Sequence, residues 1–298
     1  MQVKAAALRQ SSFLFFQDVY KSYGSKVVLD DIDLAVAQGE IVTVVGPSGC
    51  GKSTLLRLAL GQELPSAGQV LIDGKPCGFA DPSRGIVYQK YSLFPHLNVL
   101  DNVLLGPRLS CGILERRRRR QEFEEEAMRY LRRMGLEDHS RKFPHELSGG
   151  MRQRVAIAQS LIMKPKILLM DEPFGALDPG TRENMQIFLL ELWEELGMTI
   201  FFVTHDLEEA VFLGTRIIVL SQYYTDSRGE GAPRGARVVF DHALPKEAKS
   251  TVVKTAAAFG ALIQQIREQG FNPKYLRHAS QFNLTHPHSF QTLRPEED

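Results

Sequence analysis

Residues 46–53, "GPSGCGKS", decide the fold. The stretch before them, "EIVTVVG" (40–46), is apolar and rich in β-branched residues, which predicts a buried strand. The stretch after them, "KSTLLRLALG" (52–61), has apolar residues at helical spacing. A strand, a glycine-rich turn and a helix in this order form the context in which the pattern G-x-x-x-x-G-K-[ST] builds a phosphate-binding loop. The stretch therefore predicts an α/β fold with a site for a nucleotide.

The residue types in this loop suit a triphosphate. Glycines allow backbone N–H groups to point at phosphate oxygens, and the start of the following helix adds a favourable dipole. We expect Lys52 to reach the β- and γ-phosphates and the Ser53 hydroxyl to bind Mg²⁺. A glycine-rich turn that binds nothing is the competing interpretation, and the complete pattern in this context disfavours it. The predicted nucleotide-binding residues here are Gly46, Pro47, Ser48, Gly49, Cys50, Gly51, Lys52, Ser53 and Thr54.

Further short apolar stretches alternate with helical patterns, which indicates a layered α/β fold. Two of them are apolar on both faces, as in a buried parallel sheet. Ligands of such sheets bind at the carboxyl ends of the strands. We therefore expect the polar residues that end these stretches to face the nucleotide. The stretches are "RGIVYQ" (84–89), "KILLMDEP" (166–173) and "MTIFFVTHD" (198–206).

Each of these polar strand ends has a possible chemical role. Asp171 would hold Mg²⁺, and Glu172 would orient and deprotonate the attacking water as a general base. The imidazole of His205 would contact the γ-phosphate. The amide of Gln89 would reach the metal ion or the attacking water. Taken singly, each residue also fits an ordinary strand end, and their coincidence with the phosphate loop favours the functional interpretation.

A second anion-binding motif lies about a hundred residues further on, in "LSGGM" (147–151). Ser148, Gly149 and Gly150 precede a helical pattern, so their hydroxyl and N–H groups would face an anion at a helix N-terminus. The glycines also permit a close backbone approach that a Cβ atom would block. A simple helix cap is the competing interpretation.

These motifs together resemble the ATP-binding-cassette (ABC) ATPase subunits of membrane transporters, over roughly residues 13–222. "LSGGM" is similar to the signature motif of that family, and "GALD" (175–178) to its D-loop. Gln89 and His205 match its Q-loop glutamine and its switch histidine. The resemblance implies a P-loop NTPase core with a mainly parallel sheet, an antiparallel β subdomain and a helical insert.

The resemblance also implies how the protein works. Two copies would form a head-to-tail dimer, in which the phosphate loop of one chain holds ATP and Ser148, Gly149 and Gly150 of the other close over its γ-phosphate. Tyr23 would stack on the adenine, and Asp178 would run along the dimer seam. ATP and Mg²⁺ are the implied ligands, and hydrolysis would release the two chains.

The domain organisation follows from changes in composition. We expect a loose N-terminal tail over 1–12, the ABC domain over 13–222 with a helical insert at about 90–147, and a C-terminal extension over 223–298. The extension is predicted to hold one amphipathic helix and to end in a polar tail of about twenty-five residues. The helix is expected from the spacing of Val252, Ala256, Phe259, Ile263 and Ile266.

Composition excludes several classes of protein. The chain has 298 residues and a net charge of +1, which gives no reason to expect nucleic acid as a partner. The basic stretch in "ERRRRRQEFEEE" (115–126) is balanced by glutamates within one or two turns, as in a solvated helix. No apolar stretch approaches 18 residues, so any membrane-spanning subunit must be another chain.

The stretches around these motifs most resemble the nitrate/sulfonate/taurine importers. The resemblance implies a peripheral subunit at the cytoplasmic face of the inner membrane, with permease subunits and, indirectly, a substrate-binding protein as partners. A groove beside the insert would receive the permease. One alternative is a soluble ABC ATPase that acts on a macromolecule, and another is a module that binds ATP without turnover. The expected groove residues are Tyr91, Leu93, Phe94 and Leu97.

Two further expectations concern metal- and thiol-type chemistry. The Cys50 thiol lies near a helix N-terminus, so we expect it to be somewhat acidic and open to modification. The histidines of the C-terminal tail, His278, His286 and His288, are too scattered along the sequence to predict a metal site.

Overall fold

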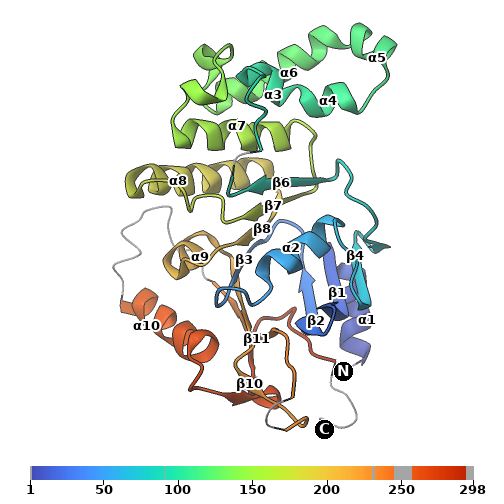
Figure 1. Ribbon diagram of the computed structural model, residues 1–298, viewed down its shortest axis with the longest axis vertical. Coiled ribbons are helices and arrows are strands. Elements are labelled where there is room, and N and C mark those ends of the chain that lie inside the picture. The colour runs from blue at the N-terminus through green and yellow to red at the C-terminus, as the bar shows by residue number, and fades with distance from the viewer. Residues whose placement is uncertain (1, 91, 230–231, 245–256, 293–298) are drawn as a thin grey trace. The chain divides into compact units, whose positions relative to one another are not determined.

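The computed structural model describes residues 2–90, 92–229, 232–244 and 257–292 (Figure 1). The chain divides into two compact units. Unit 1 contains Met1–Ala80 and Leu190–Asp298, and unit 2 contains Asp81–Leu189. Within the described part of the chain, no helix has the length and apolar character needed to cross a bilayer.

Unit 1 contains hydrogen-bonded, mainly parallel sheet strands in the order β13-β11-β9-β3-β8. Strand β3 pairs in parallel with β8 and with β9, and β11 joins the far side of β9 in the antiparallel sense. Every residue of β3 and β8 is buried, which explains why their sequences are apolar on both faces. The strands are β3 (Ile41–Val45), β8 (Thr199–Val203), β9 (Arg216–Ser221), β11 (Arg237–Ala243) and β13 (Asn283–Leu284).

Helices follow strands β3 and β8 of unit 1. Helix α2 (Lys52–Leu60) follows β3 and ends at Gly61, which adopts the left-handed conformation that glycine tolerates best. Helix α9 (Leu207–Leu213) follows β8, and its N-cap Asp206 accepts hydrogen bonds from the backbone N–H groups of Glu208 and Glu209. Both connections place polar loops at the carboxyl ends of the strands.

Unit 1 also contains an antiparallel sheet in the order β2-β1-β4-β5, which confirms the expected β subdomain. The N-terminal segment, expected to be loose, instead forms helix α1 (Gln2–Ser11). Its Leu8 is buried in a cluster with Phe15 and Leu71 of the sheet. Leu8 therefore finds apolar neighbours only when the sheet has folded. The strands are β1 (Leu14–Tyr23), β2 (Lys26–Val36), β4 (Ala67–Ile72) and β5 (Lys75–Pro76).

The C-terminal extension is part of unit 1 rather than an appendage beginning at residue 223. Its strand β11 pairs along β9, and β13 pairs with β11. The expected amphipathic helix is present as α10 (Ala257–Ile266), with Phe259, Ile263 and Ile266 buried. Val252 and Ala256 lie outside the described residues. The remaining short elements are β10 (Tyr224–Thr225), the π-helical turn η4 (Arg267–Phe271), β12 (Arg277–His278) and η5 (Ala279–Gln281).

The polar tail after Tyr275 is likewise fitted to the sheets. The ring of Phe290 stacks on Phe15 with 5.1 Å between the ring centroids. The Ser289 hydroxyl donates a hydrogen bond to Asp241, and the N–H of Thr292 donates one to Asp33. The tail shows little hydrophobic periodicity in sequence because its elements are short and are stabilised by contacts with residues far away in the chain.

Unit 2 pairs two parallel strands, β6 (Arg84–Tyr88) and β7 (Ile167–Asp171), and contains the expected helical insert. Helix α3 contacts both α6 and α7 in this unit (Figure 1). Helix α8 (Pro179–Leu196) begins in unit 2 and ends in unit 1. The helices before it are α3 (Val99–Val103), α4 (Leu105–Leu109), α5 (Ile113–Arg118), α6 (Arg120–Arg133), the 3₁₀ turns η1 (Glu137–His139) and η2 (Pro144–Glu146), and α7 (Gly149–Leu161).

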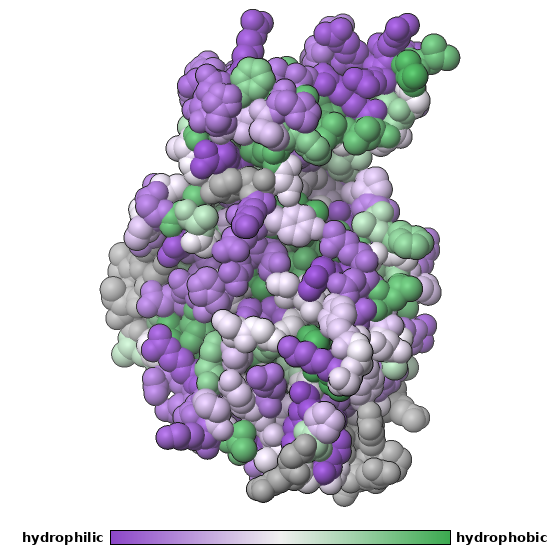
Figure 2. Space-filling view, in the orientation of Figure 1, coloured by the Kyte–Doolittle hydropathy of each residue, from purple (hydrophilic) through white to green (hydrophobic). Residues whose placement is uncertain are grey.

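Ion pairs link the arginines and glutamates of the charged stretch 115–126 in the insert, as expected. Arg119 lies 2.8 Å from Glu122, and Arg120 lies 2.8 Å from Glu124. Such exposed pairs contribute little to stability. Apolar side chains are exposed at the α4–α5 end of the insert, where Figure 2 has hydrophobic atoms on the surface. They are Leu109, Ile113 and Leu114, each at least 75% exposed.

A buried ion pair fastens the extension to the sheet of unit 1. Arg216 of β9 is fully buried, and its Nε and Nη2 atoms donate to the two carboxylate oxygens of Asp241 in β11 at 2.7 and 2.6 Å. Its Nη1 atom donates to the carbonyl oxygen of Ala35 at 2.5 Å. A buried guanidinium that loses its carboxylate keeps an uncompensated charge in the core.

We therefore predict that Asp241→Ala lowers the free energy of unfolding by about 3–5 kcal/mol. Urea unfolding followed by circular dichroism measures the change. Glu122→Ala, which removes an exposed partner of Arg119, is the control and should leave the midpoint nearly unchanged. An Asp241→Ala protein as stable as the unsubstituted chain would show that the pair does not secure β11.

Candidate functional site

The predicted phosphate loop spans the turn between β3 and α2 in unit 1. Gly49 and Gly51 have φ values of +77° and +104°, a region that side-chain-bearing residues rarely adopt. A Cβ atom on Gly46 would lie 2.2 Å from the carbonyl oxygen of Leu220 and 2.8 Å from Sγ of Cys50. The loop geometry therefore requires glycine at these positions and leads the backbone directly into the N-terminus of α2.

Lys52 curls back over this loop. Its Nζ atom donates hydrogen bonds to the carbonyl oxygens of Gly46 at 2.8 Å and Pro47 at 3.1 Å, and the side chain is buried. Ser48 and Ser53 are exposed on the same turn, and Thr54 is buried in the first turn of α2. A cationic side chain held by carbonyl groups beside exposed hydroxyls and a helix N-terminus forms a site for phosphate groups.

Cys50 does not have the acidic thiol that was expected. The residue is 1% exposed, and burial raises the pKa of its thiol, an effect that outweighs the opposing influence of the nearby Lys52 charge. Desolvation disfavours the thiolate more than the helix N-terminus favours it. Cys50 is consequently a packing residue of the loop, and its Sγ atom lies 2.8 Å from where a Cβ of Gly46 would be.

Tyr23 lies at the end of β1 and is 44% exposed. Its hydroxyl donates to the carboxylate of Glu63, and the ammonium group of Lys21 lies 5.0 Å from the centre of its ring. An exposed aromatic ring with one hydrogen bond to the protein can offer a face to a planar base. The contact between this ring and adenine stays a prediction.

His205 is exposed between β8 and α9 in unit 1. It lines a surface hollow of about 680 Å³ together with residues of the C-terminal extension. Gln264, Arg267, Glu268 and Asn272 are the polar residues that α10 and the turns after it contribute. Sequence reasoning missed them as neighbours of His205, because no local pattern links residues about sixty positions apart.

Unit 2 places three predicted residues at the ends of its two strands. Gln89 follows β6 and is exposed, Asp171 is the last residue of β7, and Glu172 comes next. Glu172 has a φ of +46°, a conformation that is uncommon for residues other than glycine. Strained backbone of this kind clusters at functional sites. The amide nitrogen of Gln89 lies 3.1 Å from where a Cβ of Gly175 would be, so a larger residue at 175 would press on it.

The second anion-binding motif begins helix α7 in unit 2. Ser148 is its N-cap, and the serine Oγ atom accepts a hydrogen bond from the N–H of Met151 at 3.3 Å. Gly150 is buried, and a Cβ there would lie 2.6 Å from the Thr181 side chain of α8. Ser148 is exposed. It can therefore cap helix α7 and still face an anion.

Asp178 has a clear structural role. It is exposed, and its carboxylate accepts a hydrogen bond from the N–H of Thr181 at 2.9 Å at the start of α8. This hydrogen bond holds the pKa of the Asp178 carboxyl below its usual range. The acid is therefore ionised at neutral pH and available on the surface.

Comparison with known proteins places these features in one family. Residues 29–175 match the ABC transporter family. A putative ATP-binding protein of Brucella abortus is 48% identical over 206 residues, which cover 69% of this chain and 77% of that protein. The chain belongs to the ABC transporter family.

Other members of the family are similar over more of the chain. The nitrate import ATP-binding protein of Synechococcus elongatus is 41% identical over 76% of this chain and 82% of its own length. The taurine import ATP-binding protein of Pseudomonas aeruginosa is 40% identical over 85% of this chain and 92% of its own. This chain is thus an ABC ATP-binding protein and an ATPase.

Solved ABC cassettes share its fold. The cbiO1 protein of Clostridium perfringens, part of the cbiONQ complex, has a TM-score of 0.67 and 28% identity over 86% of this chain and 95% of its own. The bacterial cassette MJ0796, solved as a dimer, has a TM-score of 0.63 and 32% identity over 78% of this chain and 99% of its own. The predicted P-loop NTPase fold is confirmed.

In this cassette, a buried asparagine shapes the segment after the Q-loop glutamine. The carboxamide of Asn102 accepts from the N–H of Phe94 at 2.7 Å and donates to the carbonyl of Leu97 at 2.9 Å. Phe94 is 44% exposed, Leu93 and Leu97 are partly exposed, and Tyr91 lies outside the described residues. Sequence reasoning named these apolar residues and missed Asn102, which positions two of them.

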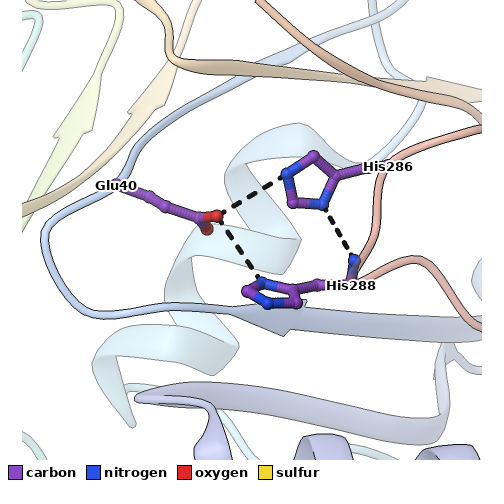
Figure 3. A group of neighbouring side chains, drawn as sticks. All are labelled: Glu40, His286 and His288. Carbon is purple, nitrogen blue, oxygen red and sulfur yellow. Dashed lines mark hydrogen bonds and ion pairs between the residues drawn. The ribbon is translucent and has the colours of Figure 1, made fainter.

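Two of the tail histidines of this ABC protein are brought together, contrary to the sequence expectation. His286 and His288 lie beside Glu40, whereas His278 lies in the separate short strand β12 (Figure 3). Glu40 comes directly before β3, more than two hundred residues away in the chain. No local spacing could have linked it to the histidines.

The burial of Cys50 leads to a prediction about labelling. In the nucleotide-free protein, Cys50 should react with iodoacetamide several-fold more slowly than Cys77 or Cys111, which are partly exposed. Mass spectrometry of timed digests follows the three thiols in one sample, so Cys77 and Cys111 are internal controls. Labelling of Cys50 at the fastest rate of the three would contradict the raised pKa and the burial.

Proposed function

We propose that this protein is the ATP-hydrolysing subunit of a prokaryotic importer, and that two copies enclose two ATP molecules head to tail. The observation that carries the proposal is the pair of exposed helix N-termini, one built on the phosphate loop and one on Ser148. Each favours an anion, and they belong to different compact units of the chain. In the proposed dimer, a γ-phosphate gripped by both N-termini lies between two chains.

The phosphate loop would hold the nucleotide. Lys52 exchanges its present carbonyl partners for the β- and γ-phosphates, and the loop N–H groups surround the phosphate oxygens. Tyr23 stacks on the adenine. The glycine geometry at 46, 49 and 51 suits this role, because a Cβ at 46 would clash with the backbone of Leu220 and the φ values at 49 and 51 favour glycine.

Oxygen donors available in the two units suit Mg²⁺, which prefers hard ligands and keeps several waters. Ser53, Gln89 and Asp171 would hold the ion. When bound, Mg²⁺ neutralises charge that develops on the phosphate oxygens.

Glu172 would act on the attacking water. Its carboxylate orients the water and accepts its proton, while His205 contacts the γ-phosphate. Glu172 directly follows β7 and has a left-handed backbone conformation, the kind of strain that clusters at functional sites. Proton transfer and positioning, rather than covalent chemistry, are the protein's contributions to phosphoryl transfer.

Closure of the dimer would complete each site. Ser148, Gly149 and Gly150 of one copy cover the γ-phosphate bound to the other, and Asp178 lies along the seam. ATP thereby stabilises the dimer, and its hydrolysis weakens it. The solved dimer of MJ0796, 32% identical to this chain, supports this arrangement.

The transported solute would be small and of the nitrate, sulfonate or taurine type. The names of the Synechococcus and Pseudomonas relatives support this class. Permease subunits in the inner membrane would span the bilayer, a substrate-binding protein would deliver the solute, and this chain would act at the cytoplasmic face. The exposed Phe94 and its neighbours would form part of the permease groove.

Replacement of the proposed base should trap the dimer. We predict that Glu172→Gln lowers ATP turnover by about 10²-fold or more, because general-base assistance is lost while ATP still binds. Phosphate release measures turnover, and size-exclusion chromatography with ATP detects the dimer. Lys52→Ala is the comparison variant and should lose both ATP binding and the dimer. Near-normal turnover by Glu172→Gln would remove Glu172 from this role.

A second variant tests the contribution in trans. Ser148→Arg should leave the affinity of the monomer for a fluorescent ATP analogue unchanged but abolish turnover, because the added charge and bulk block closure over the γ-phosphate. Ser110→Arg, at an exposed serine of the insert, is the matched control and should hydrolyse normally. Mixing Ser148→Arg with Lys52→Ala protein should restore part of the activity. Full turnover by Ser148→Arg alone would refute the head-to-tail site.

A further inference from the structure

The group formed by Glu40, His286 and His288 lies in unit 1, at the end of β3 opposite to the phosphate loop (Figure 3). The two histidines flank Pro287 in a turn that is docked on β11. The N–H of His286 donates to the carbonyl oxygen of Asp241 at 3.1 Å, and the N–H of Ser289 donates to the carbonyl oxygen of His286 at 2.9 Å. These backbone contacts hold the turn, and with it both imidazoles, beside Glu40.

The ring atoms converge on one oxygen. Nε2 of His286 and Nδ1 of His288 each lie 3.7 Å from Oε1 of Glu40. All three atoms lie within 4.8 Å of one another. A separation of 3.7 Å is too long for a hydrogen bond. It is close to the separation of about 3.3 Å between two ligands of a tetrahedral Zn²⁺ ion with bonds of about 2.0–2.2 Å.

One of these atoms is a buried polar atom without a hydrogen bond among the described residues. Nδ1 of His288 is buried and has no hydrogen-bond partner among the described residues. Most buried polar atoms do have a partner, so such an exception calls for an explanation such as a bound ion or water. The rest of the His288 side chain is 34% exposed, which leaves one side of the group open to solvent.

The carboxylate is anchored as metal ligands usually are. Oε2 of Glu40 accepts a hydrogen bond from the N–H of Ala37 at 2.9 Å and lies 3.5 Å from Nη1 of Arg216. Oε1 is thereby left to face the imidazoles.

The surrounding charge permits a cation. The positive charge of Arg216 is matched by its bidentate contact with Asp241. Arg216, Asp241 and Glu40 together therefore have a net charge of −1. His242, the other nearby histidine, is partly exposed, and its Nδ1 atom lies 2.8 Å from the Thr285 hydroxyl. Burial, and then the charge of Arg216, lower the pKa of His286 to about 4, so its ring is neutral at pH 7, as a metal ligand must be.

Binding has a cost at His286. Its Nδ1 atom accepts a hydrogen bond from the N–H of His288 at 3.2 Å, which places the ring proton on Nε2 in the metal-free protein. Binding of a metal ion at Nε2 would move this proton to Nδ1. Nδ1 would then no longer accept the 3.2 Å hydrogen bond from His288. The exchange involves no oxidation and no other reactant.

We propose that Oε1 of Glu40, Nε2 of His286 and Nδ1 of His288 bind one Zn²⁺ ion, with a water molecule in the fourth position. Two imidazoles and one carboxylate form a ligand set typical of Zn²⁺, whereas Mg²⁺ prefers oxygen ligands alone. The ion ties the C-terminal tail to the residue that precedes β3. The site is separate from the nucleotide site and independent of the function proposed above.

The test is titration of the nucleotide-free full-length protein with ZnCl₂ and, separately, with MgCl₂. Calorimetry should give one Zn²⁺ site per chain and no Mg²⁺ binding. The melting temperature should rise by about 5–10 °C when free Zn²⁺ exceeds its Kd about 100-fold. The spectrum of the Co²⁺-substituted protein should report tetrahedral coordination by nitrogen and oxygen ligands.

Four variants decide whether these residues are the ligands. The double variant His286→Ala/His288→Ala should lose the calorimetric site and the thermal shift, and Glu40→Gln should weaken Zn²⁺ binding at least about tenfold. His278→Ala, in the same tail but outside the group, is the matched control and should bind Zn²⁺ as the unsubstituted chain does. Lys52→Ala should also bind it normally, which separates this site from ATP binding.

Two outcomes would overturn the proposal. One is equal Zn²⁺ affinity in the double variant and the unsubstituted chain, which would assign binding to other residues such as the cysteines. The other is the absence of a Zn²⁺ site in the unsubstituted protein. If the double variant does not fold, Glu40→Gln and His288→Gln take its place, since both keep the size of the side chain.

Discussion

The buried charge of Arg216 is the constraint around which unit 1 is assembled. A guanidinium with no exposed surface must be paired, and here Asp241 supplies both carboxylate oxygens while Ala35 supplies a carbonyl. These partners come from β11 and β2, so one side chain joins the parallel strands, the antiparallel sheet and the C-terminal extension. The extension is consequently a structural part of the cassette.

The same cluster lies at the N-terminal end of β3, whereas the phosphate loop begins at its C-terminal end. Glu40 precedes the strand and contacts Arg216, and Gly46 follows the strand and packs against the carbonyl of Leu220. The buried ion pairs and the proposed phosphate site thus lie at opposite ends of the five-residue strand β3. This division agrees with the general rule that ligands of parallel sheets bind at the carboxyl ends of the strands.

The proposed chemistry uses simple means in each unit. Helix N-termini, glycine-rich turns and strand ends present N–H groups, hydroxyls and carboxylates in each unit. Such half-sites are well suited to a nucleotide that is enclosed only when two chains meet. The exposed positions of Ser48, Ser53 and Ser148 are consistent with surfaces that await a partner.

The sequence by itself determined the strand–loop–helix at 40–61, the helix that starts at Ser148, the polar strand ends and the family. These features are encoded within windows of ten to twenty residues, where spacing and residue type are enough. Only the tertiary structure decided that the N-terminal segment packs as a helix, that Cys50 is too buried to be acidic, and that the tail adds strands to the sheet. It also decided that His286 and His288 meet Glu40. These outcomes depend on contacts between residues far apart in the chain, whose energies arise from burial and charge pairing in the folded protein and leave no periodic trace in the sequence.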